Sequence, residues 1–489
     1  MLFRPRLPIR VLLAVAPLAA TGLIAGCGSD GPAGPPKVVL PDEGEPVEYR
    51  THIEPIFLNS CAGSECHVGG RGAGLSLASY DDLIEGSDFG AVVIPFAAAR
   101  SHLFQHINTD TTLGPRATPT MPLSRDPLPR EQILAIRRWI DEGARGPGGE
   151  VPLSGADRGR VFVTCQSEDL VTAIDLETGL ISRFIPVGFR SDIESPHNIL
   201  LSPDGASFYV VMIGAGRIEK YDAVTYELLG SVEVGLSPAQ LRVTSDGSRL
   251  YASNFDLTFQ QPFVYTFSST MSGGATAIDI EGNAPHGVTL SSDEQFLYTM
   301  NAGSDDISVV DLATHEVVDR IPIVPGSPPA PAGAAMHEPY QGEIAPDGML
   351  YVTCRKSAQV RVVDLAQRRV VDSIPVGSRP LIGAVSPDGG SFWVPNQGSN
   401  TVSIIDIPSR SVVGTIGGLQ DQPHAVAFSP DGGRAFITCE NLTGGENLHH
   451  PLEGTDVVPG IVYTVEVPSR TITRAAEVGG FAAGIVVRE

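Results

Sequence analysis

Residues 386–394 read Ser-Pro-Asp-Gly-Gly-Ser-Phe-Trp-Val, a tight turn followed at once by the start of an alternating apolar strand. Closely similar turns recur at 202–205, 244–247, 291–294, 345–348 and 429–432, about 40 to 54 residues apart. Each turn joins two short runs of alternating hydrophobicity, which is typical of a β-hairpin. A hairpin repeated at this period indicates a repeat architecture.

Two further strands follow each hairpin, for example at 402–406, and several of the last strands end on Pro-Val-Gly, as at 375–377. Four strands per unit and seven units predict an all-β seven-bladed propeller over residues 157–489. The first unit lacks its innermost strand, and residues 482–487 have the pattern of one. We therefore expect the two ends of the region to complete one blade, which removes exposed sheet edges.

The second strand of several units carries a short signature, at Tyr251-Ala252-Ser253-Asn254, Tyr298-Thr299-Met300-Asn301 and Tyr351-Val352-Thr353-Cys354. In these residues the region resembles the YVTN family of surface and periplasmic propellers. The resemblance implies the propeller fold, but it carries little information about function.

Length and charge restrict the classes of protein to consider. A chain of 489 residues is long enough for two or three domains, and 54 glycines and 40 prolines fit a turn-rich β protein. There are 33 basic and 56 acidic residues, a formal net charge of −23. Such a chain repels nucleic acid and would favour a partner protein with basic patches.

The N-terminus has the pattern of an export signal. Arg4, Arg6 and Arg10 precede an apolar run at 11–20, and the stretch ends in Ile24-Ala25-Gly26-Cys27. It resembles the bacterial lipoprotein family, which implies removal of residues 1–26, lipidation of Cys27 and a flexible tether over 27–47. By the same resemblance Gly28 favours the outer membrane, with the protein facing either the periplasm or the cell surface. An ordinary signal peptide or a single membrane helix is the alternative.

The segment 48–146 contains a haem-attachment pattern, Cys61-Ala62-Gly63-Ser64-Glu65-Cys66-His67. Two thiols can bond the vinyl groups of a haem, and the adjacent imidazole can ligate its iron. The linker is two residues longer than in the usual Cys-x-x-Cys-His. A disulfide or a zinc half-site is the alternative, although no second cysteine pair lies nearby to complete a zinc site.

Two amphipathic helices are expected to bracket this segment, one carrying Ile53, Ile56 and Phe57 and the other spanning 131–142 with a glycine cap at Gly143. The leading candidate for a second iron ligand is Met121, because prolines on both sides stiffen its loop. His102 and His106 are its rivals.

This segment resembles the planctomycete-type cytochrome c domain. The matching residues are Pro55-Ile56-Phe57, Cys66-His67, Leu75-Ser76-Leu77 with Tyr80, 101–104, Met121-Pro122 and 138–144. The resemblance implies a small all-α domain with one covalent haem c, held by thioethers from Cys61 and Cys66 and ligated through iron by His67 and Met121. The longer linker between the cysteines departs from the common family pattern.

Three histidines of the propeller region share one repeat position, each directly after a proline: His197, His286 and His424. That position begins the innermost strand, so the three should converge at one mouth of the channel, where they could bind a metal. The long insertions at 189–195, 255–274, 324–338 and 441–460 should open on the same face and bring His337, His449 and His450 to it. Simple hydrogen bonding to adjacent backbone is the alternative. Cys165, Cys354 and Cys439 also share a position and are expected to be small buried thiols.

The leading functional hypothesis is an exported, lipid-anchored electron-transfer protein that exchanges one electron with a redox partner protein, with the propeller as a docking or scaffold module. It is more an electron carrier than a self-contained enzyme. A second hypothesis is an oxidoreductase with a metal or substrate site at the histidine face of the propeller. A third is an adhesion or assembly propeller with the cytochrome as a local redox partner.

Overall fold

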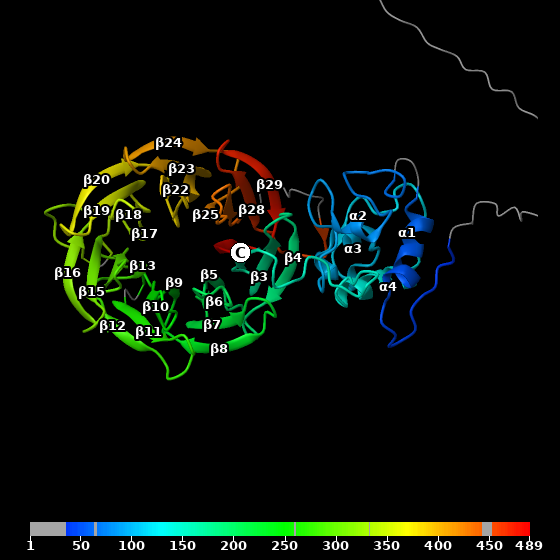
Figure 1. Cartoon of the computed structure of the whole chain (residues 1–489), viewed down its shortest axis with the longest axis horizontal. Coiled ribbons are helices and arrows are strands. Elements are labelled where there is room, and N and C mark those ends of the chain that lie inside the picture. The colour runs from blue at the N-terminus through cyan, green and yellow to red at the C-terminus, as the bar shows by residue number, and fades with distance from the viewer. Residues whose placement is uncertain (1–35, 63–65, 259–260, 332, 443–451) are drawn as a thin grey trace, which may run out of the picture.

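The computed structural model describes residues 36–62, 66–258, 261–331, 333–442 and 452–489. Seven four-stranded antiparallel sheets form a closed ring, with a helical segment beside it (Figure 1). The predicted seven-bladed propeller is therefore confirmed, including four strands in every blade.

The blades are numbered here in chain order, with the strands of each given from the channel outward. Blade 1 contains β30 (Ala482–Arg488), β2 (Arg160–Cys165), β3 (Leu170–Asp175) and β4 (Ile181–Pro186), and blade 2 contains β5 (Pro196–Leu201), β6 (Ser207–Met212), β7 (Arg217–Asp222) and β8 (Leu228–Glu233). Blade 3 contains β9 (Pro238–Val243), β10 (Arg249–Asn254), β11 (Phe263–Ser268) and β12 (Thr276–Asp279), and blade 4 contains β13 (Pro285–Leu290), β14 (Phe296–Asn301), β15 (Asp306–Asp311) and β16 (Glu316–Pro322).

Blade 5 contains β17 (Pro339–Ile344), β18 (Met349–Cys354), β19 (Gln359–Asp364) and β20 (Arg369–Pro375). Blade 6 contains β21 (Ala384–Val385), β22 (Ser391–Asn396), β23 (Thr401–Asp406) and β24 (Ser411–Ile416), with the 3-10 turn η4 (Gln397–Ser399). Blade 7 contains β25 (Pro423–Phe428), β26 (Arg434–Cys439), β28 (Ile461–Glu466) and β29 (Thr471–Glu477).

The last strand of the chain closes the ring, as the sequence predicted. β30 pairs with β2, with Val486 opposite Phe162 and Arg488 opposite Arg160. Buried apolar clusters then fill the spaces between adjacent sheets, for example where Phe162 of blade 1 stacks on Phe208 of blade 2 at a ring separation of 5.0 Å.

Two local expectations were wrong. The stretch 255–274 is not wholly an inserted loop, because β11 lies inside it and pairs with β10. The innermost strand of blade 6 is also reduced to Ala384–Val385. A Cβ at Gly383 would lie 2.6 Å from the ring of Phe392, so the chain passes too close to its neighbour there for a larger side chain.

The repeated turns are held by their own side chains. The Ser386 hydroxyl donates to the Asp388 carboxylate at 2.6 Å, and that carboxylate accepts the Gly390 N–H at 3.0 Å. Gly389 has φ +71°, which favours glycine. These bonds lower the pKa of Asp388. The same Ser-to-Asp bond recurs at Ser202 and Ser429, so a local signal fixes each hairpin.

A second repeated device joins neighbouring blades. The Thr438 hydroxyl of β26 accepts the Ala425 N–H of its own blade at 3.0 Å and donates to the Ala483 carbonyl of blade 1 at 2.7 Å. Thr164 bridges blades 1 and 2 in the same way, and Ser253 bridges blades 3 and 4. Register shifts occur at these positions in the sheets. The hydroxyl thus gives a hydrogen-bond partner to backbone groups where the shifted strand register leaves them unpaired.

The segment before the propeller is helical, with one short strand. Its elements are the π-helical turn η1 (Tyr49–Ile53), α1 (Glu54–Ser60), α2 (Tyr80–Ile84), η2 (Ala98–Arg100), α3 (His102–Ile107), η3 (Thr111–Leu113), β1 (Arg116–Ala117) and α4 (Arg130–Asp141). The two predicted bracketing helices correspond to α1 and α4. Gly143, at φ +106°, follows the C-cap of α4, and its N–H donates to the Ile140 carbonyl at 2.9 Å.

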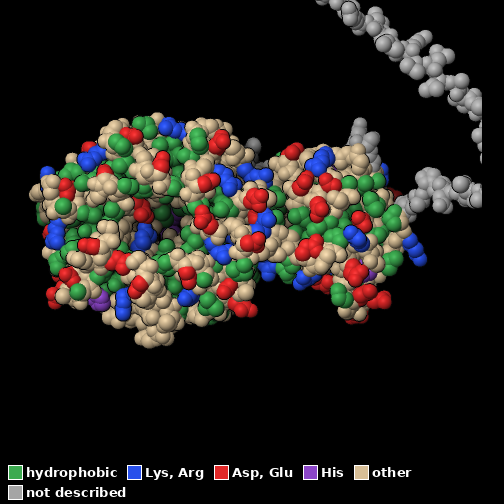
Figure 2. All heavy atoms as spheres, viewed as in Figure 1, with side chains coloured by type: hydrophobic (Ala, Val, Ile, Leu, Met, Phe, Trp, Pro, Cys, Tyr) green, Lys and Arg blue, Asp and Glu red, His purple; other side chains and the backbone are tan. Residues whose placement is uncertain are grey.

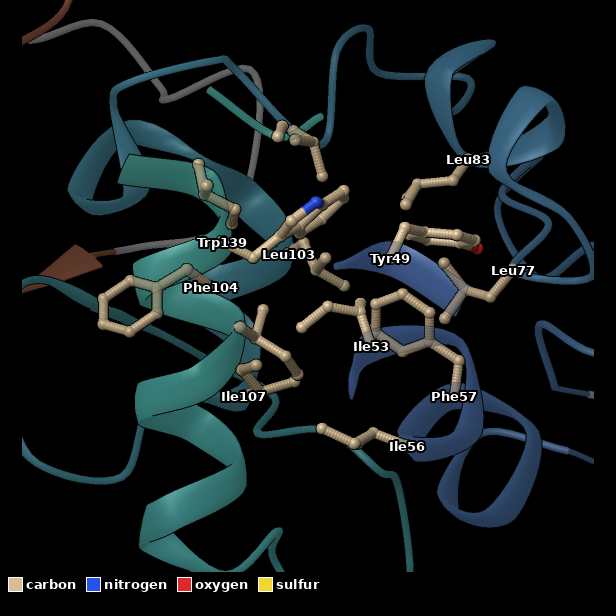
Figure 3. Packing of buried hydrophobic residues seen from close by; sticks show 14 of the residues in the cluster. Tyr49, Ile53, Ile56, Phe57, Leu77, Leu83, Leu103, Phe104, Ile107 and Trp139 are labelled. Carbon is tan, nitrogen blue, oxygen red and sulfur yellow. The ribbon is translucent and has the colours of Figure 1, made fainter. Parts of the chain in front are cut away.

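The core of this segment surrounds Trp139, which is fully buried (Figure 3). The Trp139 ring lies 5.6 Å from that of Tyr49, and Tyr49 packs edge-on against Tyr80 at 5.1 Å. The Trp139 indole donates to the Arg145 carbonyl, and the Tyr80 hydroxyl donates to that of Ala144, whereas the buried Tyr49 hydroxyl has no hydrogen-bond partner among the described residues. The terminal helices therefore pack through aromatic rings, with the loops wrapped around them.

The helical segment contacts blades 1 and 7. Arg100 pairs with Glu168, and the Arg183 guanidinium lies 3.6 Å from the centre of the Phe96 ring. β1 also pairs with β27 (Leu452–Glu453), which belongs to the long connection inside blade 7. The segment is thus attached to the outer side of the ring and leaves the channel open (Figures 1 and 2).

Across the described ranges, none of the helices combines the length and the apolar character that crossing a membrane requires. Cys27, the predicted lipidation site, lies outside the described residues, as do His449 and His450.

Candidate functional site

Two cysteines of the haem-attachment pattern lie at the end of α1. Cys61 follows the helix as its C-cap, where its N–H donates to the Phe57 carbonyl at 2.8 Å. Its side chain is buried, Cys66 is half-buried, and both thiols are free. Burial, followed by the neighbouring Cys66, raises the pKa of Cys61 to about 11. Residues 63–65 between them lie outside the described ranges.

His67 is oriented by a backbone acceptor. Its Nδ1 lies 3.3 Å from the Leu75 carbonyl oxygen, which can only accept, so Nδ1 carries the proton. The other ring nitrogen, Nε2, is left with its lone pair. Haem-ligating and metal-ligating histidines are typically oriented by such a bond.

Cys61, His67 and Met121 line one pocket. The rest of its wall is mostly apolar: Gly72, Ala73, Leu75, Leu77, Ser87, Phe89, Val92, His102, Leu103, His106 and Ile107. The Met121 N–H donates to the His106 carbonyl at 2.8 Å, which fixes the methionine loop on α3. The peptide bonds preceding Pro119 and Pro122 on either side of Met121 are both cis.

The rival ligands share this pocket. His102 and His106 both lie on α3, and both contribute to the wall. The Nδ1 of His106 is 2.8 Å from the Pro119 carbonyl oxygen, so that nitrogen is engaged with the methionine loop. The imidazole and thioether donors of the pocket are those that haem iron accepts, and its apolar wall suits a porphyrin.

The three repeat-position histidines lie in β5, β13 and β25, on the innermost strands of blades 2, 4 and 7. Although they come from separate blades, their rings meet: the His197 ring centre is 5.3 Å from that of His424 and 6.0 Å from that of His286. All three side chains are buried. Figure 2 shows the hollow at the centre of the ring that these innermost strands surround.

The entrances to two of these strands, β5 and β25, are each anchored by a neighbouring turn. The Ser195 N–H donates to the Asp169 carboxylate at 2.8 Å, and the Gln422 N–H donates to the Asn400 side-chain oxygen at 2.9 Å. Each bond holds the residue before the proline of a Pro-His pair. The proline needs no donor partner and fixes φ, so the following imidazole starts from a defined backbone position.

Each of the three imidazoles has a hydrogen-bond partner at Nδ1. The partner is the Gln166 side-chain oxygen for His197 at 2.9 Å, the Tyr340 carbonyl for His286 at 2.9 Å and the Glu440 carboxylate for His424 at 2.6 Å. The three Nε2 atoms are buried and have no hydrogen-bond partner among the described residues.

Burial also affects protonation. Burial, then the neighbouring His424, lowers the pKa of His197 to about 3, and burial lowers that of His286 well below its usual value. These two rings are therefore neutral at pH 7. Aromatic rings surround His286, with Tyr340 stacked on it at 3.4 Å and Phe255 edge-on at 4.8 Å.

The fourth candidate, His337, lies in the connection between β16 and β17. Its N–H donates to the Asp305 carboxylate at 3.0 Å, and burial lowers the pKa of its half-buried ring. The structure brings together His197, His286 and His424, whereas His337 takes no part in that ring-to-ring cluster. Within the described ranges, no three His, Cys, Asp or Glu side chains already form a ready metal-binding group.

The three propeller cysteines are buried and free of disulfides. Burial raises the pKa of Cys165 to about 11 and that of Cys354 to about 12. They are protonated, unreactive thiols at neutral pH.

The sequence analysis missed the partners of the histidines. Gln166 and Glu440 each directly follow a strand-ending cysteine, and Phe255, which packs on His286, directly follows Asn254 at the same repeat position. An alignment of the repeats at the residue after the second strand would have found them.

Comparison with known proteins supports the propeller. Residues 222–411 match the family described as "Lactonase, 7-bladed beta-propeller". The ring is thus similar to propellers of the lactonase and YncE type. The uncharacterized protein YncE of Salmonella typhi is 26% identical over 234 residues, which are 46% of this chain and 62% of that protein, and YncE of Salmonella typhimurium gives the same values. The match thus covers less than two thirds of these relatives.

Among solved structures, the periplasmic gluconolactonase PpgL of Pseudomonas aeruginosa is similar with a TM-score of 0.52 and 19% identity, covering 68% of this chain and 99% of that one. A chain of hydrazine synthase from Kuenenia stuttgartiensis has a TM-score of 0.48 and 20% identity, covering 62% of this chain and 98% of that one. At these identities the likeness concerns the fold alone.

Proposed function

We propose that this protein is an exported c-type cytochrome that transfers single electrons, with one covalent haem in the helical segment and the propeller as a docking or scaffold module. The observation that carries the proposal is the common pocket of Cys61, His67 and Met121. A thiol from the attachment pattern, an imidazole and a thioether share one mostly apolar wall, which is the donor set of an electron-transfer haem.

Each residue has a separate task. Cys61 and Cys66 would form the thioether bonds, and His67 and Met121 would ligate the iron from its two sides. The haem, when bound, supplies a one-electron redox couple. The Leu75 carbonyl holds His67 by its Nδ1–H and keeps Nε2 available, while Val92, Leu103 and the other apolar wall residues exclude water.

The first test is a reduced pyridine haemochrome spectrum of denatured, washed protein made in cells competent for cytochrome c maturation. We expect a c-type spectrum that survives washing and is lost in the double variant Cys61→Ala with Cys66→Ala. Cys354→Ala, which removes a buried propeller thiol, is the matched control and should retain the haem. No haem in the wild type, while a control cytochrome matures in the same cells, would leave the propeller as an adhesion or assembly module.

The role of Met121 has its own test. Met121→Ala should leave the haem attached but change the iron from six-coordinate low spin to a state with an open or water-filled position, seen in the optical and magnetic circular dichroism spectra. Met336→Ala removes an exposed propeller methionine and should change neither spectrum. An unchanged spectrum in Met121→Ala would assign the second ligand to His102 or His106.

The proposed location rests on the leader sequence. Cys27 would carry the lipid, and the anchor would hold the cytochrome at the outer membrane, facing the periplasm or the cell surface. With a net charge of −23, a redox partner with basic patches is favoured. Cys27→Ala should move the protein from the membrane fraction to the soluble envelope fraction, and unchanged fractionation would remove the anchor from the proposal.

A further inference from the structure

The histidine cluster in the channel, formed by His197, His286 and His424, plays no part in the proposed haem chemistry. It joins residues that are distant in sequence and come from blades 2, 4 and 7. Its three Nε2 atoms are buried and have no partner within the part of the chain that the structure describes, which is costly for any polar atom unless something else binds there.

The hydrogen bonds at Nδ1 determine what can bind. A backbone carbonyl, a carboxylate and an amide oxygen all accept, so each Nδ1 carries a proton, and the Nε2 of a neutral imidazole then presents a lone pair. Three lone pairs cannot hydrogen-bond to one another. They repel anions and attract a cation or a hydrogen-bond donor.

We propose that His197, His286 and His424 bind a borderline divalent transition-metal ion, of the zinc or copper type, through their Nε2 atoms in the channel of the propeller. Neutral imidazole is a preferred ligand of these ions. The site is separate from the haem pocket and holds whether or not the chain carries haem.

The spacing of the rings fits a shared ion. Two imidazoles bound at the usual zinc–nitrogen distance place their ring centres about 5 to 6.5 Å apart, depending on the angle at the metal. The observed separations from His197, 5.3 Å to His424 and 6.0 Å to His286, lie in this range. Since the group is not already closed into a metal-binding arrangement, binding would draw the rings together.

The surroundings orient the three ligands. Glu440 holds His424 and places a negative charge behind it, an arrangement that raises ligand basicity. Tyr340 both accepts from His286 and stacks on it. The positive charge of Arg355, which acts on His286, opposes a cation there. The carboxylate is therefore the group whose removal should weaken binding.

The test is equilibrium dialysis of the full-length chain against Zn²⁺, with zinc and iron measured together by plasma mass spectrometry. We expect about one zinc ion per chain, bound by imidazole nitrogens at about 2.0 Å in zinc-edge X-ray absorption. His197→Ala and His424→Ala should each weaken zinc binding at least tenfold, and Glu440→Gln should weaken it by about ten- to a hundredfold. The haem iron and the haemochrome spectrum should not change, which separates this inference from the proposed function.

His315→Ala, in the hairpin between β15 and β16, is the matched control and should bind zinc as the wild type does. Circular dichroism and the melting temperature establish whether each variant is folded, and Glu440→Gln is the mild substitution if a histidine variant is not. Wild-type protein that binds no zinc would show that water fills the site and would overturn the proposal. Folded His197→Ala and His424→Ala that retain zinc would overturn it as well.

Discussion

The hydroxyl bridge at the closing joint of the propeller gives a quantitative prediction. Thr438 links blade 7 to blade 1, because it accepts the Ala425 N–H and donates to the Ala483 carbonyl. Its side chain is fully buried. Thr438→Val keeps the shape of the side chain but leaves one donor and one acceptor without a partner. Each such group costs about 1 to 3 kcal/mol, so the propeller should lose about 2 to 6 kcal/mol of unfolding free energy.

The expected change in melting temperature follows from the size of the ring. At about 2.1 cal/mol/K per residue, the unfolding entropy of residues 157–489 is about 0.7 kcal/mol/K, so the melting temperature should fall by about 3 to 9 °C. Differential scanning calorimetry at one fixed scan rate measures it, because unfolding of a chain this large is commonly irreversible.

Two variants control for other effects. Thr473→Val removes an exposed hydroxyl of β29, which bonds only to the Thr464 carbonyl at 3.3 Å, and should change stability by less than about 0.5 kcal/mol. Thr438→Ser keeps the bridge, as Ser253 does in blade 3, and should lose only about 1 kcal/mol for the missing methyl group. If Thr438→Val melts within 1 °C of the wild type, or Thr438→Ser is equally damaging, the hydroxyl is not what holds the joint.

Three further predictions concern other parts of the molecule. Gly484→Ala would place a Cβ 2.8 Å from the His197 carbonyl oxygen of the next blade, so it should lower the unfolding free energy by about 1 to 3 kcal/mol, measured by calorimetry. The control Gly417→Ala has open space around its Cβ and should be neutral. Equal melting temperatures of the two variants would contradict this prediction. Glu168→Ala leaves Arg100 and the Gly480 N–H without this acceptor. The rate of amide hydrogen exchange at 89–100, measured by mass spectrometry, should therefore rise about tenfold. Unchanged exchange would show that the Arg100–Glu168 pair does not hold the helical segment on the propeller. The pKa of His197 is about 3 in the folded chain and about 6.5 when unfolded, so its contribution to stability is complete above about pH 6.5 and falls by about 1.4 kcal/mol per pH unit as the pH drops toward 3. With EDTA present, His197→Gln should flatten this fall of stability, measured by urea unfolding. An unchanged slope would contradict the prediction.

The propeller could be predicted because its determinants are local and repeated. The Ser-to-Asp bonds of the turns at Ser202, Ser291, Ser386 and Ser429 and the alternation of the flanking strands are local, so they are visible in the sequence. The signature positions also have physical roles. The third residue of the Tyr-Val-Thr-Asn-like signature, such as Ser253, provides the hydroxyl that bridges two blades by hydrogen bonds. The fourth residue, such as Asn301, donates a hydrogen bond from its side-chain amide to Ser308 of the adjacent strand at 2.8 Å.

What the sequence did not show depends on distant contacts. The strand β11 was hidden in a long connection, because the gap from β10 obscured its register. The inner strand of blade 6 spans only Ala384–Val385, and the close approach of Phe392 to the preceding Gly383 is not visible in any local pattern. The pairing of β1 with β27 joins residues 116 and 453, and the partners of the channel histidines come from neighbouring strands or blades.

The placement of the helical segment bears on how a haem would exchange electrons. Phe89 and His102 line both the haem pocket and a second pocket at the junction, where Glu168 and Phe184 form the opposite wall. The edge of the proposed haem pocket near these residues thus faces blade 1. A redox partner would have to reach the haem from another side, such as the loop that carries Met121, whose neighbour Leu123 is 61% exposed. On this geometry the propeller would cover one edge of a bound haem and would direct redox partners to its other sides, and this would be its role as a scaffold.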